Sequence, residues 1–103
     1  MPVIVVATIT PLPEHRDEVR DALQGAVGPV HGEDGCELYA LHENDDRFVM
    51  IERWASAAAL QTHSTESAGL QKLNADLKGK LQGPPDVVIL NPVPAGEPAK
   101  GAL

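Results

Sequence analysis

The stretch CELYALHENDDRFVMIERW, residues 36–54, decides the fold of this chain. It holds two runs rich in strand-forming residues, 36–43 and 47–54, separated by the polar turn 44–46. Runs of this length around a short polar turn are typical of a β-hairpin. We therefore expect two neighbouring antiparallel strands in the middle of the sequence.

Hydrophobic periodicity on either side of the hairpin predicts the other elements. They are a buried strand over 3–9, an amphipathic helix from Pro13 to Val30, a short helix capped by Ser56 and running to His63, a second, longer helix ending at Leu81, and a final strand over 86–90. Gly25, Gly28 and Pro29 are expected to loosen or kink the end of the first helix. The βαββαβ order predicts a ferredoxin-like α+β fold, with both helices on one face of a four-stranded antiparallel sheet.

The length of the chain predicts one domain. Its 103 residues leave no room for a separate regulatory domain. Residues 1–91 contain every predicted element. Residues 92–103 are rich in Pro, Gly and Ala, and predict a flexible tail that the fold does not need.

The predicted strands are apolar on both faces. Alternation along the second hairpin strand places Phe48, Met50 and Trp54 on one face, and Val49 and Ile51 on the other. Helices on one side cover only one face, and an exposed apolar face of this size favours self-association. We therefore expect a homodimer that packs sheet face to sheet face about a two-fold axis.

Charge and composition exclude several classes of partner. Fifteen acidic and eight basic residues give a net charge of −7 without any Lys/Arg cluster, which disfavours nucleic acid and anionic membranes. The longest strongly apolar run, 3–9, is too short to span a membrane and no basic leader precedes it, so we expect a cytoplasmic protein. Cys36 is the only cysteine, which excludes an internal disulfide. No phosphate-binding Gly-rich loop or metal-ligand spacing occurs, so neither a cofactor nor a metal is expected.

Three residues form the candidate catalytic group. Glu52 and Trp54 share one face of the second hairpin strand, and His63 should face the sheet from the short helix. We expect a Glu52–His63 hydrogen bond that orients the imidazole, so that its other nitrogen acts as a base inside an apolar pocket. The alternative is a structural pair whose members satisfy each other in the core. Trp54 is expected to line the pocket and donate its N–H to a bound oxygen atom, or else to fill the core.

The alternation of strand faces and the helix stripe also predict which other residues line the pocket. The expected apolar lining residues are Phe48, Met50, Leu60 and Leu73. Tyr39 and His42 lie three apart on the first hairpin strand, so they point to opposite faces and at most one lines that pocket. Tyr39 is a candidate hydrogen-bond donor to substrate and His42 a candidate second base, although an interface or surface position is the stronger expectation for each.

One joint pattern connects these residues. It comprises Gly35-Cys36, Tyr39, Leu41-His42, Phe48-Val49, Glu52, Trp54, Ala59-Leu60 and His63. At these spacings the chain resembles the antibiotic biosynthesis monooxygenase family, from Val3 to about Leu90. The resemblance implies a dimeric α+β barrel and a cofactor-independent monooxygenase. Its substrate would be an electron-rich aromatic, such as a quinol, an anthrone or a polyketide-like compound, oxidised with O₂.

The chain departs from two branches of that family. The anthrone-oxidising branch has an Asn four positions before the strand Trp and a Tyr six positions after it, where this chain has Met50 and Leu60. Haem-degrading relatives have an Asn on the first strand and a His on the long helix. This chain has no Asn in its first strand and no His in residues 68–81, which disfavours haem. The alternative function is a non-catalytic dimeric small-molecule binding or stress-response protein, which needs the same dry pocket but no base.

Overall fold

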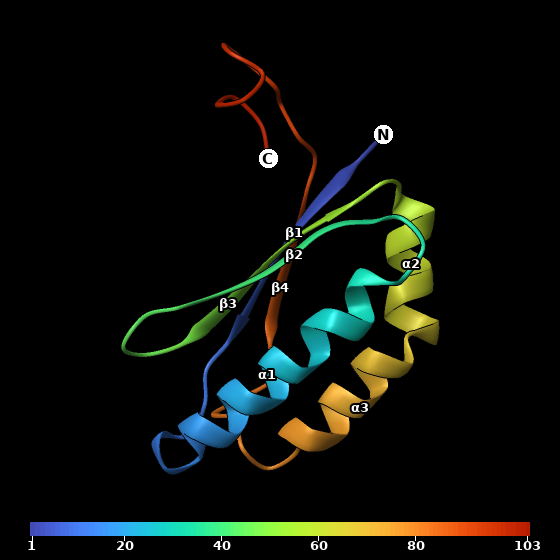
Figure 1. Cartoon of the computed structure of the whole chain (residues 1–103). Coiled ribbons are helices and arrows are strands. Elements are labelled where there is room, and N and C mark those ends of the chain that lie inside the picture. Colours follow the sequence, from blue (N-terminus) through green and yellow to red (C-terminus); the bar gives the residue numbers. More distant parts are fainter.

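The computed structural model describes all residues, 1–103. The elements are β1 (Val3–Ile9), a 3-10 turn (Pro13–His15), α1 (Arg16–His31), β2 (Cys36–Glu43), β3 (Phe48–Trp54), α2 (Ala57–Glu66), α3 (Ala68–Leu77) and β4 (Asp86–Leu90). The strands pair antiparallel in the order β2-β3-β1-β4. All three α-helices lie on one side of this sheet (Figure 1). The predicted ferredoxin-like α+β fold is confirmed.

The inner face of the sheet and the facing helix stripes form the core. In β3 every second side chain is buried, and those between are only half-buried, which confirms the predicted alternation. The buried set in β3 is Phe48, Met50, Glu52 and Trp54. The helices add Val19, Leu23, Ala26 and Val30 from α1, and Leu73 and Leu77 from α3. Each large apolar side chain buried in this way stabilises the fold by about 1.5–3 kcal/mol.

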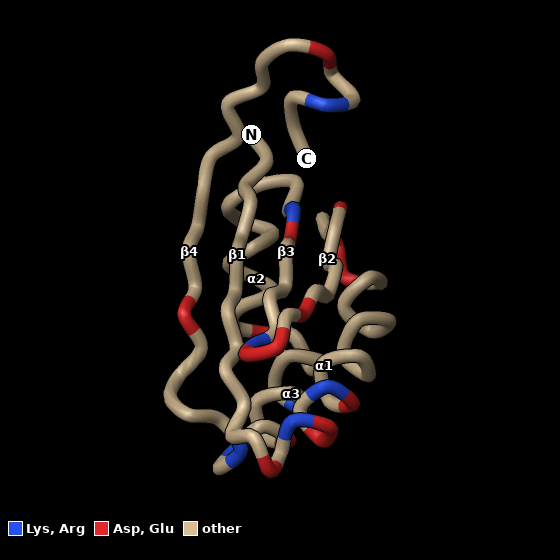
Figure 2. The backbone as a smooth tube through the Cα atoms, turned by 90° about the vertical axis from the view of Figure 1, so that its left-hand side faces the viewer, with Lys and Arg blue, Asp and Glu red and all other residues tan.

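The outer face of the sheet is apolar and is not covered by the helices. Val6 pairs with Ile51 and with Val88, and Ile51 pairs with Ala40, so one row of apolar side chains crosses all four strands. Val49 lies on the same face, next along β3. In a side view the strand layer carries few charges, which gather on the helices and turns (Figure 2).

Three helix ends differ from the prediction, and one of them is that of α2, which runs to Glu66 and not to His63. Pro29 does not loosen α1, which runs on to His31. Pro29 removes one backbone hydrogen bond from α1, but the fully buried Val30 holds the last turn against the core. The last helix stops at Leu77 instead of Leu81, because Gly79 adopts a φ of +78° that turns the chain. Leu81 then forms a β-bridge with Pro11, and α3 is no longer than α2.

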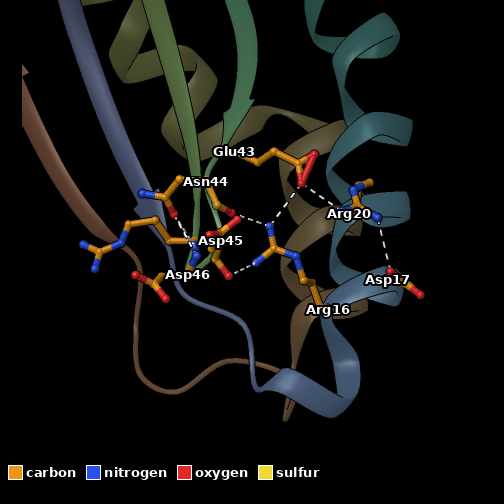
Figure 3. A network of polar contacts seen from close by, with 8 residues as sticks. Arg16, Asp17, Arg20, Glu43, Asn44, Asp45 and Asp46 are labelled. Atoms are coloured by element: carbon orange, nitrogen blue, oxygen red, sulfur yellow. Dashed lines mark hydrogen bonds and ion pairs between the residues drawn. The ribbon is translucent and has the colours of Figure 1, made fainter.

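A charged network fastens the hairpin to α1 (Figure 3). Arg16 and Arg20 both donate to the Glu43 carboxylate, at 3.0 Å and 2.8 Å, and these hydrogen bonds hold the pKa of Glu43 below its usual value. Arg16 also donates to two backbone carbonyls of the turn 44–46. Its guanidinium lies 4.8 Å from the centre of the Phe48 ring, which therefore packs under the network.

The segment after β4 forms neither helix nor strand. Most of residues 91–103 are exposed, and one hydrogen bond, from Arg53 Nη1 to the Leu103 carbonyl, ties them to the sheet. The flexibility of this tail stays a prediction. None of the helices combines the length and the apolar character that crossing a membrane requires.

Candidate functional site

A cavity of about 240 Å³ lies between the inner face of the sheet and the helices α2 and α3. Eleven of its sixteen lining residues are hydrophobic, so its walls suit a largely apolar ligand. The polar lining residues are Tyr39, Glu52, His63, Ser64 and Asn74. No Lys or Arg lines the cavity, so it offers no cation to an anionic ligand.

His63 projects from α2 towards the sheet. Ser56 caps this helix by accepting a hydrogen bond from Ala59 N at 3.1 Å, which fixes where its first turn begins. His63 is the buried residue of α2, at 5% exposure. Its ring packs against Trp54 at a centroid distance of 4.5 Å and meets the edge of Tyr39 at 5.8 Å. The imidazole is therefore held between two aromatic rings.

The predicted Glu52–His63 hydrogen bond is wrong. His63 Nδ1 instead pairs with Glu33 Oε1, at 2.8 Å. Glu52 Oε1 accepts from Trp54 Nε1 at 2.9 Å, because these two residues are neighbours on one face of β3. The indole N–H of Trp54 is thus used inside the protein and is not available to a bound oxygen atom.

Glu33 was not among the residues predicted for the site. It lies in the turn between α1 and β2, where nothing in the sequence distinguishes it from the acidic residue that follows. Gly35 brings this turn against α2: its φ is +80°, and a Cβ there would lie 2.5 Å from Ala59 Cβ. Any other residue would push α2 away and separate Glu33 from His63.

The Glu33 contact defines which nitrogen of His63 is free. A carboxylate only accepts hydrogen bonds, so in the neutral ring Nδ1 carries the proton and Nε2 carries the lone pair. Nε2 has no hydrogen-bond partner within the chain. Every fully buried side-chain nitrogen or oxygen does have a partner, so Nε2 is not fully buried. His63 lines the cavity and its Nδ1 is turned to Glu33, which does not line it, so the opposite ring nitrogen, Nε2, is the one available to a ligand in the cavity.

Burial raises the pKa of two further groups on the cavity wall, so each holds its proton more firmly than it would in water. It raises the pKa of the Glu52 carboxyl, and the indole hydrogen bond and nearby His63 offset this only in part. Burial also raises the pKa of the Tyr39 phenol, with the charges of Glu52 and Glu33 adding to the effect. Tyr39 therefore stays a hydrogen-bond donor at neutral pH.

We expect Glu52→Gln to stabilise the protein at about pH 8 but not at about pH 4. The amide keeps an oxygen that accepts from Trp54 Nε1, and it removes the buried charge. Because the folded-state pKa of Glu52 is raised, its stabilising contribution is complete below the unfolded pKa and is lost as pH rises through the folded pKa. Urea unfolding across this pH range measures the difference.

Glu14→Gln, on the exposed turn before α1, is the matched control for loss of one carboxylate. A stability gain for Glu52→Gln that is equal at both pH values would contradict the raised pKa of Glu52. So would a loss of stability at pH 8.

The structure brings together only part of the expected pocket. Of the expected residues, those that line the cavity are His63, Glu52, Tyr39, Met50, Leu60 and Leu73. Trp54 is fully buried behind His63, and Phe48 lies at the other end of β3. His42 is exposed and points away, with Nδ1 near the Ala40 carbonyl. The placement of Trp54 and Phe48 as lining residues, and of His42 as a second base, is therefore wrong. His42 takes the surface position that was the stronger expectation for it. Tyr39 does not take such a position, because it is buried and lines the cavity.

The structure contains no group of three or more His, Cys, Asp or Glu side chains placed to hold a metal ion. The titratable groups of the site described above are one imidazole, two carboxyl groups and one phenol. Groups of these kinds can donate and accept hydrogen bonds with a polar ligand.

Comparison with known proteins assigns the family. A family model described as antibiotic biosynthesis monooxygenase matches residues 2–71, more than half of the chain. The chain belongs to the antibiotic biosynthesis monooxygenase family. The matched stretch includes the hairpin, α2 and the turn with Glu33.

Two curated relatives carry names of the same kind. "Putative monooxygenase Rv0793" from Mycobacterium tuberculosis (strain ATCC 25618 / H37Rv) is 39% identical over 64 residues, which are 60% of this chain and 63% of the relative. "Putative monooxygenase YcnE" from Bacillus subtilis (strain 168) is 35% identical over 89 residues, which are 84% of this chain and 93% of the relative. The chain thus spans just under two thirds of the first relative and nearly all of the second.

Two solved structures are similar to this chain over most of its length. The structure of Rv0793 from Mycobacterium tuberculosis matches 94% of this chain and 100% of its own, with a TM-score of 0.86 and 31% identity. The structure of PA3566 from Pseudomonas aeruginosa matches 86% of this chain and 91% of its own, with a TM-score of 0.76 and 31% identity. The family description and the names of the two curated relatives support a monooxygenase role at the level of the family, without indicating a substrate.

Proposed function

We propose that the protein is a cofactor-independent monooxygenase that oxidises a small, electron-rich hydroxylated aromatic of the quinol, anthrone or polyketide-like class with O₂. The observation that carries the proposal is the free Nε2 of His63, held by Glu33 and open to an apolar cavity. A neutral imidazole in such a place is a general base for a weakly acidic O–H or C–H group.

The cavity supports this class of substrate. At the packing density of protein interiors, about 0.74, it has room for roughly 180 Å³ of ligand, enough for two or three fused rings. Its apolar walls suit aromatic rings, and Tyr39 offers one donor for a substrate oxygen. The absence of Lys and Arg from the lining favours a neutral phenol over a carboxylate or a phosphate.

The reaction proposed for this site balances without any further reagent. His63 Nε2 removes a proton from a CH₂ group beside the aromatic ring or from a phenolic OH, and the resulting carbanion or enolate attacks O₂. His63 returns the proton to the peroxide anion formed on carbon. Loss of water from the hydroperoxide leaves a carbonyl, so one oxygen atom enters the product and the substrate supplies all four electrons.

The test is oxygen consumption with a panel of quinols and anthrones, in air and under argon, together with labelled O₂ and mass spectrometry of the product. We expect one labelled oxygen atom in the product, above the rate of spontaneous oxidation. If a panel member binds by calorimetry but is not consumed, the non-catalytic binding module becomes the better account. Release of H₂O₂ in place of oxygen insertion would contradict the monooxygenase.

We also propose that the protein works as a homodimer joined through the outer face of the sheet. The supporting observation is the apolar row formed by Ala40, Ile51, Val6 and Val88, which no helix covers. A second copy of the same face is self-complementary through a two-fold axis. In that arrangement the cavity on the inner face stays free, so one copy of the site serves each subunit.

A further inference from the structure

Ser67 stands at the junction of α2 and α3 and has two hydrogen-bonding roles. It is 6% exposed, and its backbone is extended between the two helices. As the N-cap of α3, its Oγ accepts from Leu70 N at 3.0 Å. The helix that begins there supplies three leucines to the cavity, Leu70, Leu73 and Leu77.

The same hydroxyl contacts Glu33. Ser67 Oγ donates to Glu33 Oε2 at 2.6 Å, while Glu33 Oε1 pairs with His63 Nδ1. A serine hydroxyl has one hydrogen, and the capping bond uses only a lone pair, so the hydrogen is left for Glu33. Both oxygens of the Glu33 carboxylate are thereby fixed.

Glu33 needs this second contact to keep its position. Its side chain is 23% exposed, and it borders a shallow groove on the far side of His63, lined also by Asp34, Thr62 and Glu66. A carboxylate bordering solvent and beside other acidic groups is attracted outward into water. The Ser67 hydrogen bond opposes that rotation.

We infer that Ser67 is a positioning residue for the His63 base. It acts through Glu33: the hydroxyl holds the carboxylate, the carboxylate holds the proton on Nδ1, and the lone pair of Nε2 then faces the cavity. The role in catalysis rests on the function proposed above, but the effect on the tautomer of His63 does not depend on any substrate.

The experiment compares three variants by the ¹⁵N shifts of the histidine ring nitrogens, which report which nitrogen carries the proton. Ser67→Ala removes both the cap and the donor. Ser67→Asp keeps a good capping oxygen but has no hydrogen to donate and places a second carboxylate beside Glu33. Ser56→Ala is the matched control, because it removes the equivalent cap of α2 without touching Glu33.

We expect the Nδ1-protonated form of His63 to predominate in the wild type and in Ser56→Ala, and to fall on the order of tenfold relative to the Nε2-protonated form in both Ser67 variants. Ser67→Thr, which keeps cap and donor, should restore the wild-type spectrum. With an accepted substrate, turnover should fall by a similar factor in Ser67→Ala and Ser67→Asp, while Ser56→Ala loses only thermal stability.

A wild-type tautomer ratio in Ser67→Asp, or in a folded Ser67→Ala, overturns the inference. An equal change in Ser56→Ala also overturns it, because the effect would then follow from loss of a helix cap. If the tautomer changes as expected but the wild type oxidises nothing, the positioning role stands and the proposed monooxygenase function fails.

Discussion

Replacing His63 with alanine should lower turnover of a quinol or anthrone by about 10²–10⁴-fold, the usual effect of removing a general base. The variant loses the free Nε2 that lines the cavity, while the lining leucines and Tyr39 remain. Oxygen uptake under saturating substrate measures the loss, and calorimetry should show that the substrate still binds.

His63→Gln controls for the fold, because its amide still donates to Glu33 but has no basic nitrogen. We expect the same loss of turnover with a smaller loss of stability. His42→Ala, a substitution of the exposed histidine on β2, should leave turnover unchanged. Full oxygen uptake by a folded His63→Ala would show that another group removes the proton.

Replacing Ile51 with glutamate should convert the proposed dimer into a folded monomer at micromolar concentration. Ile51 lies in the middle of the outer face, where it pairs with Val6 on β1 and with Ala40 on β2. Two glutamates brought together at a two-fold axis repel each other and lose their hydration, so association becomes unfavourable. Sedimentation equilibrium gives the mass, and circular dichroism reports the fold.

Gln24→Glu on the exposed side of α1 adds the same charge and should leave the mass at that of a dimer. Val49→Glu, on the outer face of the same strand, should repeat the effect of Ile51→Glu. A wild type that is monomeric and well folded at this concentration would contradict the proposed interface. So would an Ile51→Glu variant that remains dimeric.

The fold could be predicted from sequence because its signals are local and periodic. The alternation that buries Phe48, Met50 and Trp54 is visible in seven consecutive residues, and the structure confirms it. Helix ends were less predictable, since they depend on a single turn. At Pro29 the packing of the neighbouring Val30 outweighed the propensity of proline to end a helix.

The site was predictable only where its residues lie on regular elements. His63 and Glu52 were placed beside the cavity from helix and strand periodicity alone. Their predicted pairing was wrong, because a nearer donor, Trp54 Nε1, occupies Glu52. Glu33 lies thirty residues before His63 in an irregular turn, and its position depends on how that turn packs against α2. Periodicity carries no information about such a contact.

The division of the cavity between two helices has a consequence for how such a protein diversifies. His63 projects from α2, whereas the leucines that bound the space for a ligand come mostly from α3. Substitutions at Leu70, Leu73 or Leu77 would change the shape of the space available to a ligand without moving the imidazole of His63. Variants that differ only along α3 would therefore accept ligands of different shape while they keep the same imidazole on α2.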